Sequence, residues 1–257
     1  MNLESTFYWL MHSILGFRVN GVQASAKQFQ GYCTWPFSQV VSPVKNLICS
    51  YPDTSGGICE MLAAKWLEQH AKGGSIVNWI SSSGDVTEVD NNKVRQLMQL
   101  FAVGTTMRSG AMVGKPQTGR VNQDLATETW LRSQGVIKRR QLTGGVPLLG
   151  GGYYHPSRGA SAQPGRQDFS TAIARDIIQS KGSYKIIGIN GPQFSHAMAA
   201  WSDEDVSFFD PNFGEYWFAR PQDFVSWLPN FWYSAGYDMP VLGLNSGYVI
   251  QEFALSL

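Results

Sequence analysis

The sequence predicts an α+β fold in which a helical N-terminal half packs on a C-terminal antiparallel β-sheet. Apolar residues recur at helical spacing up to about residue 180 and in short β-branched and aromatic runs after it,. The chain shows neither alternation of strands with helices nor a glycine-rich phosphate loop,. These observations favour segregated helices and strands over a doubly wound parallel sheet.

The helices are predicted from apolar residues three and four positions apart. The first ends at Gly16, before the turn signal of residues 18–21, and the next stops at Gly73 and Gly74,. The helices are expected at residues 3–16, 57–71, within 85–102, 122–134 and 168–180, with a short one at 221–228.

Three stretches between the helices are predicted to be irregular. Residues 22–52 contain Pro36, Pro43 and Pro52, and we interpret them as a segment that covers the fold and leads to the second helix,. Residues 103–120 and 144–165 are rich in glycine and are predicted loops,.

The strands are predicted from short aromatic and β-branched runs separated by turn signals. Residues 202–205 and 211–214 are such turns, which is typical of an antiparallel meander,. The expected strands cover residues 184–189, 195–201, 206–210 and 215–218, with further strands at 231–237 and 248–253.

The 257 residues suit one large domain or a main domain with an extension,. We divide the chain into an N-terminal extension or covering segment, 1–50, and a main domain, 51–257. The formal net charge of +1 gives no electrostatic argument for a nucleic-acid partner,. The densest basic run, residues 138–140, is interpreted as a solvated loop.

No integral membrane segment is expected, since no apolar run reaches the length that spans a bilayer,. Residues 1–17 are apolar, but Glu4 stands where a signal peptide carries positive charge, and His12 and Ser13 interrupt the run,. A packed or partner-binding amphipathic helix is the preferred interpretation.

The three cysteines, Cys33, Cys49 and Cys59, are too few for a disulfide scaffold and lack the spacing of a zinc site,. We therefore expect no metal and no cofactor. Cys33 and Cys49 could form a disulfide or be buried thiols.

Cys59 follows the pair Gly56–Gly57 and begins a predicted helix. Thr54 or Ser55 could cap its first turn, and the glycines leave room for a substrate backbone. A thiolate there lies at the positive end of the helix dipole, which favours the ionised thiol. The competing interpretation is a core cysteine, because free cysteines are among the most buried residues.

His196 and Asp210 offer a base and an orienting carboxylate on two predicted neighbouring strands. A nucleophilic cysteine needs both. A hairpin turn centred on Asp203 would place His196 directly opposite Asp210,. Taken singly, each has a structural alternative, a hydrogen-bonded histidine and a turn-forming aspartate before Pro211.

Three blocks resemble the motifs of the YopT/AvrPphB cysteine proteases, papain-like effector proteases that bacteria deliver into host cells. The blocks are residues 56–66, with Gly-Gly-Ile-Cys-Glu and Ala-Lys-Trp, residues 195–197, with Ser-His-Ala, and residues 208–215, with Phe-Phe-Asp-Pro-Asn-Phe-Gly-Glu. The resemblance implies a papain-like catalytic domain over 51–257, with Cys59 as nucleophile, His196 as general base and acid, and Asp210 orienting His196.

The resemblance also implies an oxyanion site. The backbone N–H of Cys59 would supply one donor. Relatives place an amide side chain shortly before the nucleophile as the second donor, whereas this chain has Asp53 and Thr54 there and Asn46 further off.

The function that the resemblance implies is a bacterial effector or toxin that is secreted into a host cell and acts as a thiol peptidase on a host protein. A glutamine deamidase or transglutaminase would use the same triad, because a triad does not specify which carbonyl is attacked. The third possibility is a non-enzymatic module that binds through its aromatic C-terminal region. The substrate and the oligomeric state are not indicated by the sequence.

Overall fold

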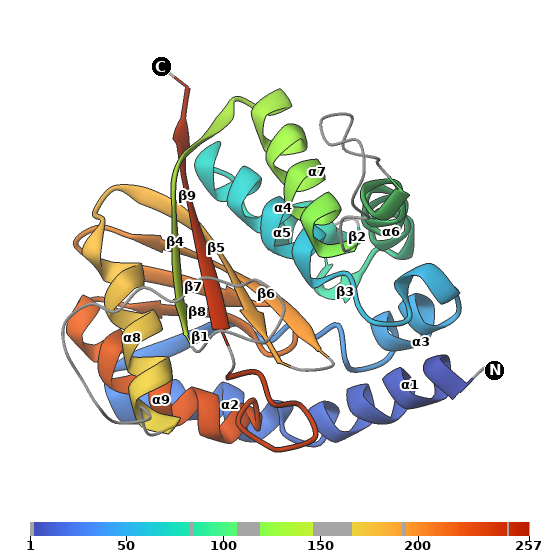
Figure 1. Ribbon diagram of the computed structural model, residues 1–257, viewed down its shortest axis with the longest axis horizontal. Coiled ribbons are helices and arrows are strands. Elements are labelled where there is room, and N and C mark those ends of the chain that lie inside the picture. Colours follow the sequence, from blue (N-terminus) through green and yellow to red (C-terminus); the bar gives the residue numbers. More distant parts are fainter. Residues whose placement is uncertain are drawn as a thin grey trace.

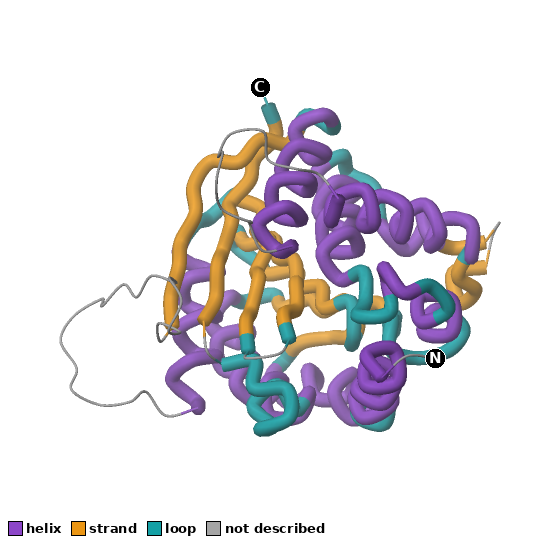
Figure 2. Tube along the Cα trace, turned by 45° about the vertical axis from the view of Figure 1, so that its right-hand side comes forward, coloured by secondary structure: helices purple, strands orange, loops and turns teal. Residues whose placement is uncertain are grey.

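The computed structural model describes residues 3–82, 85–106, 119–145, 166–191, 194–245 and 247–256. Within these ranges a seven-stranded antiparallel sheet lies between two groups of helices (Figure 1; Figure 2). Its order is β1-β8-β7-β6-β5-β9-β4. The strands are β1 (Gly31–Trp35), β4 (Val136–Gly145), β5 (Ser183–Asn190), β6 (Ser195–Ser202), β7 (Val206–Asp210), β8 (Gly214–Phe218) and β9 (Gly247–Leu255).

The helices cover both faces of this sheet. One face meets α4, which contacts β5, β6 and β7, and the other meets α8 and α9. A small hairpin, β2 (Ser81–Ser82) and β3 (Asp85–Val89), stands apart from the main sheet. The helices are α1 (Leu3–Gly16), α2 (Val19–Ser25), α3 (Val44–Cys49), α4 (Cys59–Ala71), α5 (Ile76–Ile80), α6 (Asn91–Thr106), α7 (Gly119–Ser133), α8 (Arg166–Gln179) and α9 (Pro221–Ala235), with the short 3-10 helices η1 (Ala26–Phe29) and η2 (Pro52–Thr54).

Adjacent residues of the central strands serve two separate cores, because strand side chains alternate between faces. Phe208 belongs to the core under α8 and α9, and Phe209 belongs to the core under α4. Met198 and Ala199 divide in the same way. The central strands are therefore apolar on both faces, which explains their continuous hydrophobic runs.

Trp227 of α9 is an anchor of the first core. Its side chain is fully buried, and its indole N–H donates to the hydroxyl of Ser25 at 2.9 Å. We expect Trp227→Ala to lower the free energy of unfolding by about 3–5 kcal/mol, because it leaves a cavity and removes the hydrogen bond that the Ser25 hydroxyl accepts,. Tyr233→Ala, on the same helix at a side chain that is 72% exposed, should change it by less than about 0.5 kcal/mol. Urea unfolding of both variants checks this, and equal losses would contradict it.

The predicted α+β fold class is confirmed, as are the helices near residues 3–16, 59–71, 119–133 and 166–179 and the meander of β5 to β8. The predicted strand at 231–237 is wrong, since α9 continues through Pro229 to Ala235. Its buried aromatic face, with Phe224, Trp227, Phe231 and Trp232, outweighs the hydrogen bond that the proline removes,. Most of the aromatic residues considered for a binding patch, namely Trp227, Phe231, Trp232 and Tyr237, therefore form core, whereas Tyr233 is exposed.

The helix expected within 85–102 is confirmed by α6, which begins at Asn91 after the hairpin of β2 and β3. Two other expectations were wrong. The chain forms β1 in the stretch expected to be irregular. Residues 138–140 lie in β4, where Arg140 forms an ion pair with Glu252 at 2.6 Å. The predicted loops at 103–120 and 144–165 fall mostly outside the described residues, and α6 extends to Thr106.

The division of the chain at residue 50 stays a prediction. Val19, Val22 and Ala26 lie in the first core, and β1 pairs with β8, so the described part of residues 1–50 packs tightly on the rest. In the described ranges, no helix combines the length and apolar character needed to cross a bilayer,.

Candidate active site

Cys59 is the first residue of α4 and lies half-buried at one end of the sheet. Gly57 has a φ of +109°, a backbone conformation that glycine adopts at little cost, and it turns the chain into the helix,. The N-cap residue is Ile58, which contributes no side-chain hydrogen bond. The first backbone N–H groups of α4 therefore point towards the space beside the Cys59 thiol.

Thr54 and Ser55 do not cap this helix, contrary to expectation. The Thr54 hydroxyl donates to the carbonyl of Ile48 at 2.8 Å, and the Ser55 hydroxyl donates to that of Pro52 at 2.9 Å. Both side chains serve the turns before the glycine pair, since a hydroxyl bonds readily to a carbonyl three to six residues back.

His196 and Asp210 form a buried hydrogen-bonded pair. His196 Nε2 donates to Asp210 Oδ1 at 3.0 Å, and the two side chains are 5% and 0% exposed. The turn lies one residue further along than predicted, centred on Glu204, because Ser202 pairs with Val206. The pairing register is therefore shifted by two residues, and His196 does not lie directly opposite Asp210. His196 and Asp210 are therefore diagonal neighbours on one face of the sheet, still within reach of each other.

The Asp210 carboxylate has further donors. The backbone N–H of Asn212 donates to Oδ1 at 2.7 Å, and the Tyr237 hydroxyl donates to Oδ2 at 2.7 Å. Both carboxylate oxygens are thus satisfied inside the protein, where an unpaired charge would be costly. These bonds fix the orientation in which Asp210 meets the imidazole.

Cys59 forms a side-chain hydrogen bond with His196. Since Nε2 faces Asp210, the other ring nitrogen, Nδ1, is the one available to the thiol. Burial lowers the pKa of His196, but the charge of Asp210 and the hydrogen bonds to Asp210 and Cys59 raise it to about 10,. The imidazole therefore favours its protonated form beside the sulfur.

A cleft of about 260 Å³ opens beside Cys59 and His196. Its walls come from α1 through Tyr8, from the segment of residues 52–60, from α6 and α7, and from the start of β6. Tyr8 and Phe194 pack edge to face with ring centroids 6.1 Å apart. The thiol, the imidazole and the helix N-terminus thus meet in one accessible space.

The residues proposed for the second oxyanion donor are not equivalent. Asp53 lines the cleft. Asn46 is exposed on α3, and Thr54 is committed to the Ile48 carbonyl. The buried amide nearest the glycine pair is that of Gln39, whose side chain lies 3.5 Å from the position of a Cβ built on Gly57. The sequence did not indicate a role for three residues. Gln39 lies far from the motif blocks. Asn212 lies within a block as an apparent turn residue, and Tyr237 has the character of a core residue.

Cys33, Cys49 and Cys59 are all free thiols. Burial raises the pKa of Cys33 to about 11 and raises that of Cys49 above its ordinary value,. Thiolate formation at neutral pH is thereby disfavoured at both. Cys33 and Cys49 therefore do not form a disulfide with each other.

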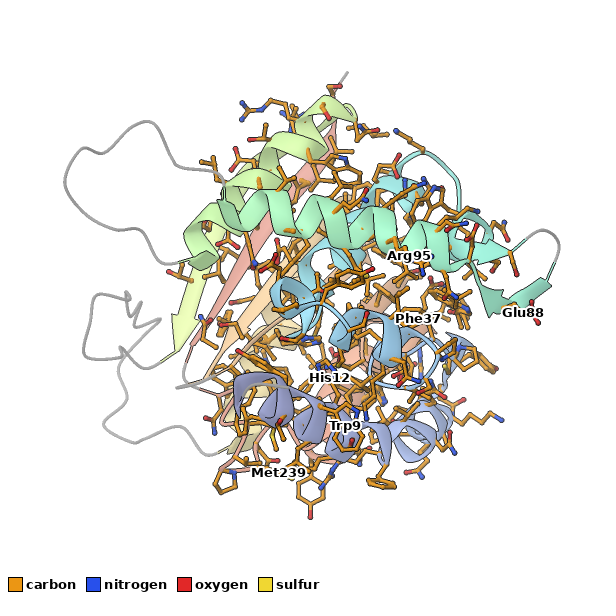
Figure 3. The ribbon with its side chains drawn as sticks, turned by 90° about the vertical axis from the view of Figure 1, so that its right-hand side faces the viewer. Trp9, His12, Phe37, Glu88, Arg95 and Met239 are labelled. Carbon is orange, nitrogen blue, oxygen red and sulfur yellow. The ribbon has the colours of Figure 1, made fainter. Side chains whose placement is uncertain are left out.

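His12 links α1 to the glycine turn before Cys59. It lies on the inward side of α1 (Figure 3) and is 5% exposed. Its Nδ1 lies 3.5 Å from Cys49 Sγ, and the ring forms a hydrogen bond with the backbone of Gly56. Burial and the charge of Lys45 lower the pKa of His12 to about 4, so the ring is neutral at pH 7.

This neutral His12 predicts a pH-dependent stability. The unfolded chain binds a proton at His12 below about pH 6.5, while the folded protein does so only near pH 4, so acid favours unfolding,. Between about pH 7.5 and pH 5, the wild-type protein should lose about 2 kcal/mol more free energy of unfolding than His12→Gln. Urea unfolding at both pH values measures the difference. Parallel losses would contradict the prediction.

Among the described residues, no group of histidine, cysteine and acidic side chains has the arrangement of a metal site. The chemistry available to these residues is that of a thiol, an imidazole and backbone N–H groups. Such an arrangement can attack a carbonyl, stabilise the resulting oxyanion and move a proton to a leaving group.

Sequence comparisons show one family. The profile of the peptidase C58 family, described as Yersinia/Haemophilus virulence surface antigen, matches residues 23–243. The cysteine protease yopT1 of Yersinia enterocolitica serotype O:8 is 28% identical over 253 residues, which cover 96% of this chain and 71% of that protein. The protein adenylyltransferase and cysteine protease IbpA of Histophilus somni is 26% identical over 231 residues, which are 86% of this chain and 5% of that protein.

A solved structure shares the fold. The crystal structure of the Pseudomonas avirulence protein AvrPphB superimposes with a TM-score of 0.52 at 14% identity, covering 80% of this chain and 95% of that one. The helices and antiparallel sheet described above are thus those of a papain-like protease. The chain belongs to the peptidase C58 family of YopT/AvrPphB-type cysteine proteases and is a cysteine-type peptidase.

Proposed function

We propose that Cys59, His196 and Asp210 form the catalytic triad of a peptidase that acts on a host protein. The observation that carries the proposal is the continuous hydrogen-bonded line from the Cys59 thiol through His196 to the buried Asp210, in the wall of an open cleft. Each group has a role in acyl transfer: the thiolate is the nucleophile, the imidazolium is the acid, and the carboxylate fixes the ring.

The first half of the reaction forms a thioester. The Cys59 thiolate attacks the scissile carbonyl, and the electron pair of the C=O bond moves to the oxygen, where the backbone N–H of Cys59 donates to it. The tetrahedral intermediate then collapses and the C–N bond breaks. His196 gives its proton to the departing amine, so the first product leaves uncharged at nitrogen.

The second half consumes water. Neutral His196 takes a proton from a water molecule in the cleft, and the resulting hydroxide attacks the thioester carbonyl. Collapse of this second intermediate releases the carboxylic acid and restores the Cys59 thiolate beside protonated His196. The raised pKa of His196 supports this resting pair.

The substrate that we propose is a protein of a host cell into which a bacterium secretes this chain. The family description names virulence, and the relatives are named cysteine proteases. The test incubates a host-cell lysate with the wild-type protein or Cys59→Ala and identifies new protein N-termini by mass spectrometry. Termini that depend on Cys59 support the proposal. Their absence with an unlabelled wild-type protein, whose Cys59 reacts with a thiol-directed probe in a separate sample, would contradict it.

The same experiment distinguishes peptide cleavage from attack on a side-chain amide. A glutamine deamidase would use the same triad and convert glutamine to glutamate in an intact substrate, and a transglutaminase would join two chains. Cys59-dependent fragments support the peptidase, whereas a Cys59-dependent change in intact substrates alone would favour these alternatives.

A further inference from the structure

We propose that Gln39 is a positioning residue that fixes the start of the nucleophile helix against the His196–Asp210 pair. The inference rests on the proposed roles of Cys59, His196 and Asp210. Gln39 lies between β1 and α3, twenty residues before Cys59, outside the three motif blocks.

The Gln39 side chain spans the gap between the two parts of the site. Its Oε1 accepts a hydrogen bond from the backbone N–H of Ile58 at 3.0 Å, immediately before Cys59. Its Nε2 donates to Oδ1 of Asn212 at 2.9 Å, in the turn that follows Asp210. One amide therefore links the backbone of the nucleophile segment to the Asn212 side chain of the segment that follows Asp210.

The bridge continues to the carboxylate that orients His196. Asn212 Nδ2 donates to the Tyr237 hydroxyl at 3.2 Å, and that hydroxyl donates to Asp210. The backbone N–H of Asn212 also donates to Asp210, and the backbone N–H of Gln39 donates to the carbonyl of Pro211 at 2.8 Å. A displacement of Gln39 would thus reach Asp210 by two routes.

Burial makes this bridge rigid. The exposed fractions are 2% for Gln39, 4% for Asn212 and 0% for Ile58, Asp210 and Tyr237. Hydrogen bonds in such surroundings are strong, and a donor that loses its partner there is penalised. The glycine at position 57 provides the φ of +109° with which the chain passes the Gln39 amide, and this amide lies within van der Waals contact of the turn,.

A positioning role is needed because Cys59 and His196 come from different layers of the fold. Cys59 begins α4, whereas His196 lies in the sheet. Misplacement of reacting groups by about 1 Å costs on the order of 100-fold in rate. A residue that ties the two layers at the site therefore governs the thiol–imidazole distance without touching the substrate.

The test follows the rate at which iodoacetamide alkylates Cys59 across pH, read by mass spectrometry of the peptide that contains Cys59. Gln39→Met keeps the side-chain size and removes both hydrogen bonds. We expect it to lower the rate by roughly 10- to 100-fold near neutral pH and to change the shape of the pH profile. Gln251→Met is the matched control, because Gln251 is 4% exposed in β9, away from the cleft, and it should keep the wild-type profile.

Coupling between the two ends of the bridge gives a second measurement. Asn212→Ala should lower the alkylation rate by itself and add little in the Gln39→Met background, since both changes break the same link. Fully multiplicative effects would contradict the bridge. Should Gln39→Met not fold, Asn212→Ala alone tests the bridge from its other end, because it removes the acceptor of the Gln39 amide and leaves the bond to Ile58 in place.

Two failures can be told apart. A wild-type Cys59 that reacts no faster than Cys33 would contradict the proposed triad and, with it, the role of Gln39. A reactive wild-type Cys59 with an unchanged rate and pH profile in Gln39→Met, even at a lower melting temperature, would contradict the role of Gln39 alone.

Discussion

Replacement of Cys59 by alanine is expected to lower the rate of substrate cleavage by at least about 10⁴-fold, because Cys59 is the only thiol among the described residues that line the cleft,. Binding of the substrate should persist, since Cys59 contributes little surface to the cleft. The rate is measured on the first Cys59-dependent substrate found in the host lysate, at equal concentrations of folded protein.

The other two cysteines are the controls for this prediction. Cys33→Ala and Cys49→Ala should keep the cleavage rate within a small factor of the wild-type rate, because burial keeps both thiols in their protonated form,. Two results would contradict the assignment of the nucleophile. One is cleavage by a variant that lacks Cys59, and the other is a loss of cleavage in a Cys33→Ala variant that is fully folded.

Asp210→Asn is expected to lower the cleavage rate by roughly 10²- to 10⁴-fold while the fold persists. The change keeps the shape of the side chain and removes its charge. Asparagine also cannot accept hydrogen bonds with both terminal atoms, so the bonds from His196, Tyr237 and the backbone of Asn212 compete for one oxygen,. The imidazole then loses its fixed orientation.

The same variant should shift the pH dependence in a defined direction. In the wild-type protein the charge of Asp210 raises the pKa of His196 against the effect of burial, so His196 stays protonated to high pH. Without that charge His196 loses its proton at lower pH, and the alkaline limb of the Cys59 alkylation profile moves down in pH. Asp223→Asn, at an exposed ion pair with Arg220, is the control and should leave the profile unchanged. A shift to higher pH in Asp210→Asn would contradict the assignment.

Local patterns in the chain were sufficient to predict most helices and the central strands. The helix that begins at Cys59 has a continuous apolar face, and the meander from β5 to β8 has short turns between neighbouring strands. Both depend on residues close together in the sequence, for which periodicity and turn residues are informative. The pairing of His196 with Asp210 was found for the same reason, although the turn lies one residue further on.

The features that were missed depend on distant partners. β1 becomes a strand because it pairs with β8, and α9 passes Pro229 because its aromatic residues fill the core. Gln39 gains its role only when Ile58 and Asn212 converge on it. Such contacts leave no trace in the local sequence, and a polar residue in an apparently irregular segment has no pattern that distinguishes it.

The order of strands in the sheet has a consequence for the timing of activity during synthesis. The ribosome releases Cys59 and its helix before His196 exists, a delay of roughly 10–30 s at ordinary translation rates. β1 cannot pair until β8 has been made. β9, the last of the described strands, lies between β5 and β4. A nascent chain thus carries the Cys59 thiol before His196 and Asp210 have been made, and the sheet that holds these two residues is complete only once β9 has been made.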